Sequence, residues 1–190
     1  LAQKPLIPNN RTTHDSPLTT HAMTLEFLMK DYVAFNVWAN ALFVNWLKSK
    51  PLELMDREVP SSFPSLRGTL LHIWSAQDIW LQRLQGTSPN HLISATFQGS
   101  NTELMDGLMQ NSAAFRDFIG SRDSGYFSQK IGYTHTTGIP YEQYTTEIIQ
   151  HCMQHSTYHR GQIVTIARNL GLTDPPKSDY IGYVRERGIK

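Results

Sequence analysis

Four long segments of this 190-residue chain carry apolar residues at three- and four-residue steps, the spacing of a helix with one buried face. The segments span residues 24–49, about 65–86, about 101–119 and about 141–170. A proline or glycine stands at or just beyond the end of each segment, where helices usually stop. Four amphipathic helices of this length predict an all-α protein, most simply an antiparallel four-helix bundle.

The remaining stretches predict smaller features. Residues 122–140 place aromatic and β-branched residues between turn formers, which predicts a small β-hairpin or extended excursion before the last long helix. A Pro-Pro break and one short helix from Asp179 are expected in the tail. Residues 1–22 are rich in Pro, Asn, Thr and Ser without periodicity. We interpret them as an N-terminal extension outside a core domain over residues 23–190.

Charge, apolar runs and cysteine content bear on the partners and the compartment of the protein. The chain has 17 Lys and Arg residues against 16 Asp and Glu residues, with no clustered basic patch, so a nucleic-acid partner is not expected. No apolar run approaches the roughly 20 residues of a membrane-spanning helix, so a membrane partner is not expected either. Cys152 is the only cysteine, which fits a cytoplasmic protein but does not exclude export.

Three histidines predict a metal site. His155 and His159 are four residues apart in the last predicted helix, so their side chains leave one face about one turn apart. His72 lies in the second predicted helix, where small neighbours such as Ala76 leave space beside it. Two ligands from one helix and one from another are typical of metal sites in helical bundles. Three neutral nitrogens would leave a coordination position open for water or substrate.

Each of these residues also has a simpler interpretation. A hydrogen-bonded core histidine is a common outcome, and HxxxH is a common accidental spacing.

His151, one turn earlier, is interpreted as a residue behind the ligands or at the surface, and Cys152 as a packing residue. Gly161 suggests a close helix approach. Glu147 and His151 are the nearest candidates for a general base, but no catalytic residue is assigned.

Three stretches resemble the DinB family, small bacterial four-helix-bundle proteins grouped with the thiol-dependent S-transferases. They are VWAN at 37–40, SSFPSLRGTLLHIWSAQDIW at 61–80, and HSTYHRGQIVTIARNLG at 155–171, which PPKSDY follows. The resemblance covers residues 23 to about 182. It implies that His72, His155 and His159 bind one divalent metal ion, nickel or zinc, with water completing the coordination shell. It also implies frequent homodimers.

Two further expectations concern the surface. The family often has an acidic residue where this chain has Gln77, and a helical wheel places Gln77 about 140° from His72, so we expect Gln77 at the surface. Some apolar residues of the first two helices exceed one buried stripe and predict a homodimer interface, unless loops and the tail cover them. These residues are Phe43, Val44, Ile73, Trp74 and Leu81.

The resulting hypothesis is a metal-dependent enzyme that acts on a small molecule. A three-histidine metal can bind a low-molecular-weight thiol as the thiolate and lower its pKa for attack on an electrophile, as in an S-transferase. The alternatives are a metal-dependent hydrolase, which activates water, and a non-enzymatic metal-binding or scaffold protein. The residues alone do not separate these three.

Overall fold

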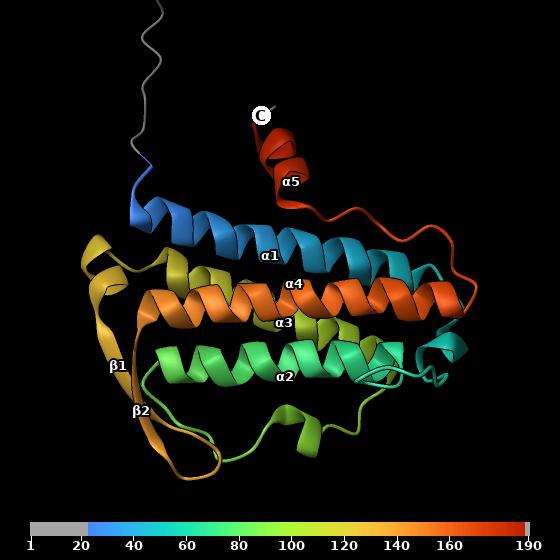
Figure 1. Cartoon of the computed structure of the whole chain (residues 1–190), viewed down its shortest axis with the longest axis horizontal. Coiled ribbons are helices and arrows are strands. Elements are labelled where there is room, and N and C mark those ends of the chain that lie inside the picture. Colours follow the sequence, from blue (N-terminus) through green and yellow to red (C-terminus); the bar gives the residue numbers. More distant parts are fainter. Residues whose placement is uncertain (1–22, 189–190) are drawn as a thin grey trace, which may run out of the picture.

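A computed structural model of the protein describes residues 23–188 and shows a bundle of four long helices (Figure 1). The helices are α1 (Leu25–Lys48), α2 (Leu66–Leu84), α3 (Asn101–Gly120) and α4 (Thr145–Asn169). The predicted four-helix bundle is therefore confirmed, whereas the predicted extension over 1–22 lies outside the described residues. Within the described part of the chain, every helix is too short or too polar to cross a bilayer.

The helices pack in a ring in which α1 and α2 both contact α3 and α4. Figure 1 shows α1 and α4 running in one direction and α2 and α3 in the other, so α2 and α4 form an antiparallel pair. Because α2 and α3 are parallel, the connection over residues 87–100, which contains η2 (Ile93–Ala95), returns along the length of the bundle. The antiparallel pairing places the start of α2 opposite the later part of α4.

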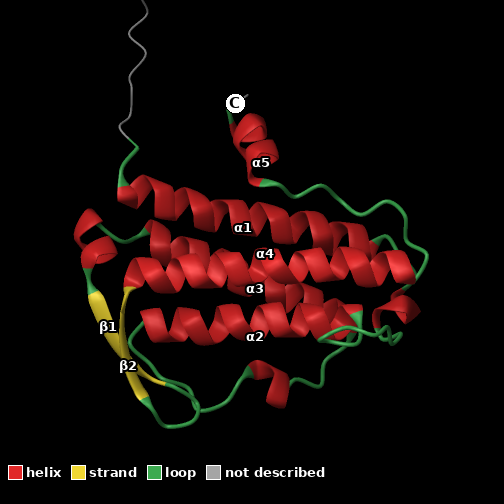
Figure 2. Ribbon diagram, in the orientation of Figure 1, coloured by secondary structure: helices red, strands yellow, loops and turns green. Residues whose placement is uncertain are grey.

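A two-stranded hairpin lies between α3 and α4, as predicted (Figure 2). Strands β1 (Lys130–Thr134) and β2 (Pro140–Tyr144) are antiparallel, with Tyr133 opposite Tyr141. Strand β2 contains residues that we predicted as the first turn of the last helix, so the predicted start of that helix was wrong. The helix starts at Thr145 because the strand pairing continues to the residue before it.

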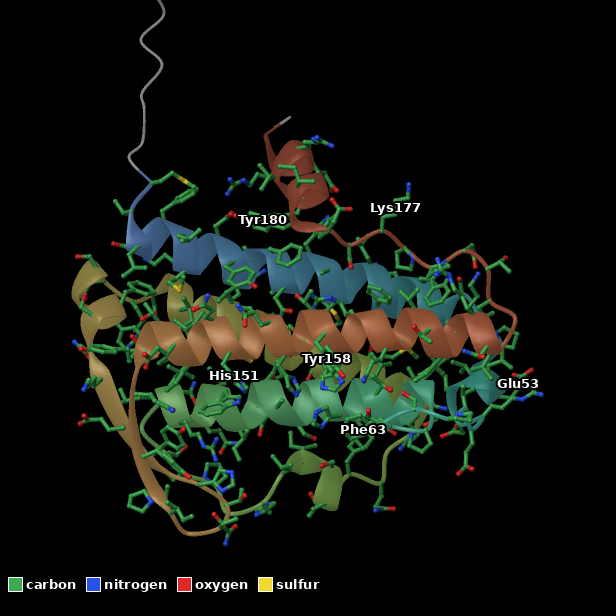
Figure 3. All side chains as sticks on the ribbon, viewed as in Figure 1. Glu53, Phe63, His151, Tyr158, Lys177 and Tyr180 are labelled. Atoms are coloured by element: carbon green, nitrogen blue, oxygen red, sulfur yellow. The ribbon has the colours of Figure 1, made fainter. Side chains whose placement is uncertain are left out.

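The tail ends in a short helix, as predicted, and this helix packs against α1. Helix α5 (Tyr180–Arg187) begins after Asp179, whose carboxylate accepts a backbone hydrogen bond from Gly182. The hydroxyl of Tyr180 donates to the buried Asp31 of α1 at 2.6 Å. Tyr180 accordingly lies between α5 and α1 in Figure 3. These contacts fix the tail on the bundle face opposite α2.

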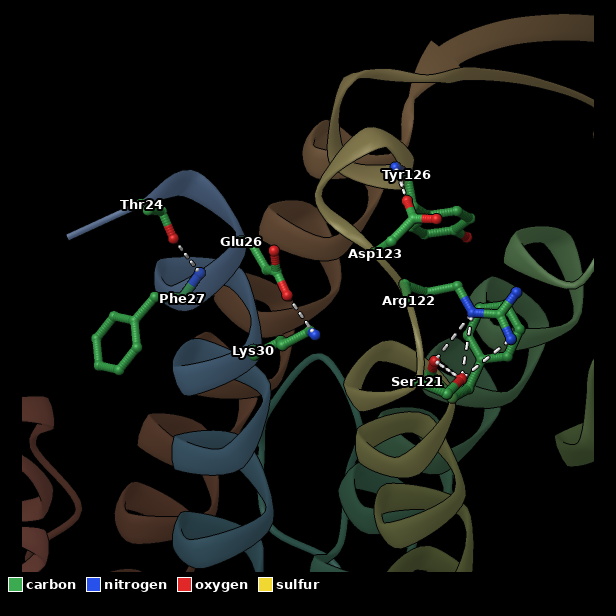
Figure 4. Close-up of polar contacts among 9 residues, drawn as sticks. Thr24, Glu26, Phe27, Lys30, Ser121, Arg122, Asp123 and Tyr126 are labelled. Atoms are coloured by element: carbon green, nitrogen blue, oxygen red, sulfur yellow. Dashed lines mark hydrogen bonds and ion pairs between the residues drawn. The ribbon is translucent and has the colours of Figure 1, made fainter. Parts of the chain in front are cut away.

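Side-chain caps define several helix starts. Ser65 caps α2 and Ser100 caps α3. At the end of the bundle where α1 begins, Thr24 accepts a hydrogen bond from the backbone of Phe27 (Figure 4). Asp123 caps the short η3 helix (Ser124–Ser128) next to it in the same way. The other short helix, η1 (Leu52–Met55), lies in the loop before α2.

A buried polar layer divides the core into two apolar halves. One half lies where α1 ends and α2 begins, and the other lies at the opposite end of the bundle. Between them, each of the four helices contributes at least one buried polar side chain. These side chains are Asn36, Asn40, Gln77, Ser112 and Arg160.

Arg160 is the centre of this layer. Its guanidinium donates to the side-chain oxygens of Asn36 at 2.6 Å and Asn40 at 2.8 Å, and burial lowers its pKa to about 10. Gln77 accepts from both asparagines and donates to Ser112. The expectation that Gln77 lies at the surface was wrong: it is fully buried because α2 contacts two neighbouring helices and buries a wide arc.

The apolar residues that suggested a dimer interface are mostly buried within this one chain. Trp74 is half-buried and packs edge-on against Phe97 of the 87–100 connection, at 5.2 Å between ring centroids. The others lie in the core, and they are Phe43, Val44, Ile73 and Leu81. The reason for expecting the interface was therefore wrong. The homodimer itself stays a prediction, which sedimentation at tens of micromolar protein tests directly; a strictly monomeric species would contradict it.

Gly161 does not mark a close helix approach, because a Cβ at this exposed position of α4 would meet nothing within 4 Å. We therefore expect Gly161→Ala to raise the free energy of unfolding by about 0.5–1 kcal/mol, since alanine loses less backbone entropy in a helix. Urea denaturation measures this change. Gly107 of α3 is the matched contrast, because its Cβ would collide with the Trp74 ring, and Gly107→Ala should destabilise the protein. Equal effects of the two substitutions would contradict the assignment.

Candidate metal centre

The three predicted histidines converge at one point of the seam between α2 and α4. The Nε2 atom of His155 lies 2.9 Å from Nε2 of His72 and 3.1 Å from Nε2 of His159. Ligand atoms of all three lie within 4.8 Å of one another. Nitrogens bound at about 2.0–2.1 Å to a shared ion, at angles of roughly 90–109°, are separated by about 2.9–3.4 Å. The donor set therefore fits a single divalent ion.

Aromatic rings surround the cluster. Phe63, in the loop before α2, stacks on His72 with 4.0 Å between ring centroids and meets His159 edge-on at 5.5 Å. Tyr158 packs edge-on against His159 from the exposed side. In Figure 3, Tyr158 and His151 lie on the α4 side of the seam and Phe63 lies on the α2 side. Phe63 was not predicted from the sequence, because a loop residue has no periodic signal.

Hydrogen bonds orient the rings for ligation. Nδ1 of His159 donates to the side-chain oxygen of Gln162 at 2.7 Å, which leaves the Nε2 lone pair directed into the cluster. Nδ1 of His155 is buried and has no partner among the described residues. Within residues 23–188, the ring nitrogens of His155 therefore contact the other two histidines alone. This arrangement argues against an ordinary hydrogen-bonded core histidine at that position.

The cluster is held in the neutral form that metal ligation requires. Burial, and then repulsion from His159, lower the pKa of His72 from 6.5 to about 4. Burial lowers the pKa of His155 to about 3, with further repulsion from His159, His72 and His151. At neutral pH these imidazoles therefore offer free lone pairs without first releasing protons.

These shifts predict an acid-sensitive metal-free protein. As pH falls below about 6.5, unfolded histidines take up protons while His72 and His155 stay neutral until about pH 4 and 3. The free energy of unfolding should therefore decrease across that window and stay level above it. Urea denaturation in the presence of a chelator, repeated between pH 7.5 and 4.5, measures the slope of the free energy of unfolding against pH. The double variant His72→Ala/His155→Ala should show a shallower slope, and an identical slope would count against the shifts.

The neighbouring candidates have other positions. His151 lies 6.0 Å from His155 between ring centroids and packs on Trp80, outside the ligand group. Cys152 is fully buried, and burial raises the pKa of its thiol, so the packing interpretation is confirmed. The Glu147 carboxylate is exposed and accepts a hydrogen bond from the backbone of Tyr144 at the start of α4.

A pocket of about 210 Å³ opens beside the cluster. His72 and His155 contribute to its wall, together with Ala76 on α2 and His135 in the turn of the hairpin. Arg83 lines the same pocket from three turns further along α2. Arg83 was not predicted as a site residue, although a residue eleven positions after His72 lies only about 20° away on the helix.

Comparisons with known proteins agree with this architecture. Protein DinB of Bacillus subtilis (strain 168) is 25% identical over 162 residues, which cover 82% of this chain and 92% of that protein. The uncharacterized protein YizA of the same strain is 23% identical over 164 residues, covering 81% and 94%. Among solved structures, YfiT from Bacillus subtilis has a TM-score of 0.58 at 11% identity, covering 80% of this chain and 93% of YfiT. YfiT is described as a probable metal-dependent hydrolase with an unusual four-helix bundle topology.

The match at the level of the family extends over nearly all of the bundle. The sequence profile of the DinB family matches residues 20–187, which include all four long helices, the hairpin and the three clustered histidines. Sequence match, four-helix architecture and histidine cluster thus agree, and the chain belongs to the DinB family.

Proposed function

We propose that this protein is a metal-dependent enzyme in which His72, His155 and His159 hold one divalent ion, nickel or zinc. The observation that carries the proposal is the convergence of three neutral Nε2 atoms beside a pocket. When bound, such an ion supplies a Lewis acid with an open coordination position. The residues of the chain supply the rest: Gln162 orients His159, and Phe63 covers His72.

Thiol transfer to an electrophile is the reaction that the pocket supports best. Among the described residues, no Asp or Glu lines the pocket, so a carboxylate general base is lacking there. A free thiol has a pKa near 8.5, whereas that of water is about 15.7, so a thiol needs far less help to lose its proton. A site without a carboxylate base is therefore better suited to a low-molecular-weight thiol than to water.

Hydrolysis is the second candidate, favoured by the description of YfiT as a probable metal-dependent hydrolase. His151 is the residue that would then serve as the base. It lines the pocket, and burial lowers its pKa, so the ring is neutral at pH 7 and free to accept a proton. This role requires a water molecule between His151 and the reacting group.

Turnover assays on protein loaded separately with Ni²⁺ and Zn²⁺ test both candidates. We expect loaded protein to accelerate reaction of cysteine with monochlorobimane more than hydrolysis of p-nitrophenyl acetate, and His155→Ala to abolish the acceleration. His91→Ala, at an exposed histidine outside the pocket, is the matched control. Faster ester hydrolysis that His151→Ala slows would favour the hydrolase. A protein that binds metal but accelerates neither reaction would support the non-enzymatic alternative.

A further inference from the structure

Arg83 is a buried cation without an acceptor. The residue is only 3% exposed, yet its guanidinium makes no hydrogen bond or ion pair with any residue of 23–188, and its Nε atom is buried and unpartnered. It contacts instead the rings of Trp80 and Tyr133, at 4.5 and 4.6 Å from their centroids. Arg160 is also buried and has an unpartnered Nε atom, but its terminal nitrogens donate to three side-chain oxygens, whereas those of Arg83 donate to none within residues 23–188. Buried guanidinium groups without oxygen partners are costly, so an unfilled site for an acceptor is indicated.

Arg83 and the histidine cluster line the same pocket. Arg83 stands eleven positions after His72, which corresponds to about 16 Å along α2. The two groups therefore line one trough between α2 and α4, to which Thr136 and His135 of the hairpin turn also contribute. Its volume of about 210 Å³ is below the range of roughly 300–1,000 Å³ for drug-sized ligands, so it suits a small metabolite.

The charge of this trough has one sign. Its ionisable lining groups are Arg83 and four histidines, without a carboxylate. A neighbouring hollow of about 340 Å³ shares Trp80, His135 and His151 with it, and Glu147 is the acidic residue that lines that hollow. A metal ion held by three neutral imidazoles would add its full positive charge. An anion is thus the complementary ligand, and the planar guanidinium fork fits carboxylate or phosphate oxygens.

We propose that Arg83 binds an anionic group, a carboxylate or a phosphate, of the small-molecule substrate whose reactive end reaches the histidine cluster. The position of the reactive end rests on the proposed function, whereas the anion site does not. The rings of Trp80 and Tyr133 contact the guanidinium without accepting a hydrogen bond from it, so its N–H groups stay available to the ligand. Thr136, in the hairpin turn over the pocket, offers a hydroxyl as a further donor.

The first test uses metal-free wild-type protein and three probes of similar size: butyrate, n-propyl phosphate and the neutral butyramide. Arginine Nε–H signals are followed by NMR, with the Arg83 signal assigned by its loss in Arg83→Lys. We expect at least one anion to shift the Arg83 signal and to bind about tenfold or more tightly than butyramide. The stronger of the two anions identifies the carboxylate or the phosphate. Equal binding of all three probes, or anion binding that leaves the Arg83 signal unmoved, would overturn the proposal.

Variants separate binding from a purely structural role of Arg83. Arg83→Met keeps the packing of the stem against Trp80 and should reduce anion binding about tenfold while leaving butyramide unaffected. Arg67→Met is the matched control, because Arg67 lies on the same helix over the ring of Phe97 but outside the pocket. If Arg83→Met does not fold, the difference in affinity between charged and neutral probes for the wild-type protein still tests the proposal. Anion binding without catalytic turnover would sustain this proposal while contradicting the proposed function.

Discussion

His155→Ala is expected to reduce bound divalent metal from about one ion per chain to less than roughly a tenth, because its Nε2 atom is the one that contacts both other histidines. Binding to the folded state alone stabilises it by about 4 kcal/mol when free metal exceeds Kd about 1,000-fold. For a domain of this size the wild-type Tm should therefore rise by roughly 10 °C with metal. The variant should lose that rise. Elemental analysis and thermal unfolding with Ni²⁺ or Zn²⁺ measure both quantities.

The same experiment distinguishes a ligand from a structural histidine. In the presence of a chelator, His155→Ala should unfold close to the wild type, because it removes a ring whose Nδ1 atom has no partner. His72→Ala and His159→Ala should behave alike, whereas His151→Ala should keep its metal. Retention of one tightly bound ion in His155→Ala, or in His72→Ala, would contradict the three-ligand assignment.

Gln77→Leu should lower the free energy of unfolding by about 2–4 kcal/mol, even though leucine is apolar and similar in size. The side-chain oxygen of Gln77 accepts from Asn36 and Asn40, and these two residues also hold the buried Arg160 guanidinium. Removal of the amide leaves the Asn36 donor without an acceptor and leaves Asn40 with Ser112 alone. Both lie beside a buried cation that contacts no carboxylate of residues 23–188. Urea denaturation at pH 7 measures the loss.

Gln77→Glu is the matched control for this prediction. It keeps an acceptor oxygen for both asparagines and adds the negative charge that the layer lacks. We expect it to lose less stability than Gln77→Leu at neutral pH. If Gln77→Leu were as stable as the wild type, the layer would tolerate apolar replacement, and the network would contribute nothing to stability.

Most of the fold was predictable because each long helix combines a periodic apolar pattern with a local stop or cap. The start of α4 was not predictable, because Tyr141–Tyr144 suits a strand or a helical turn, and only pairing with β1 decides between them. Two errors share one cause. A bundle helix such as α2 contacts two neighbours, so a single-stripe wheel wrongly placed Gln77 at the surface and Ile73 in a dimer interface.

The candidate site likewise contains residues that the sequence predicts and residues that it does not. The convergence of His72, His155 and His159 followed from helix spacing plus antiparallel packing of α2 on α4, both of which leave a sequence signal. Phe63 and His135 reach the cluster and its pocket from loops, whose paths depend on tertiary packing. Arg83 was accessible to the wheel argument but is recognisable as unusual only once its missing acceptor is seen.

The polar layer also bears on how accurately the helices are aligned. Arg160 directly follows His159, and through Asn36 it is linked to Gln77, five residues after His72. A slip of one helical turn, about 5.4 Å, would bury the guanidinium among apolar side chains. Metal–ligand distances, by contrast, can deviate by only about 0.2 Å from their usual values. Folded Gln77→Leu protein should therefore bind metal more weakly, and unchanged affinity would argue otherwise. Affinity for the ion would then depend on side chains that never approach it.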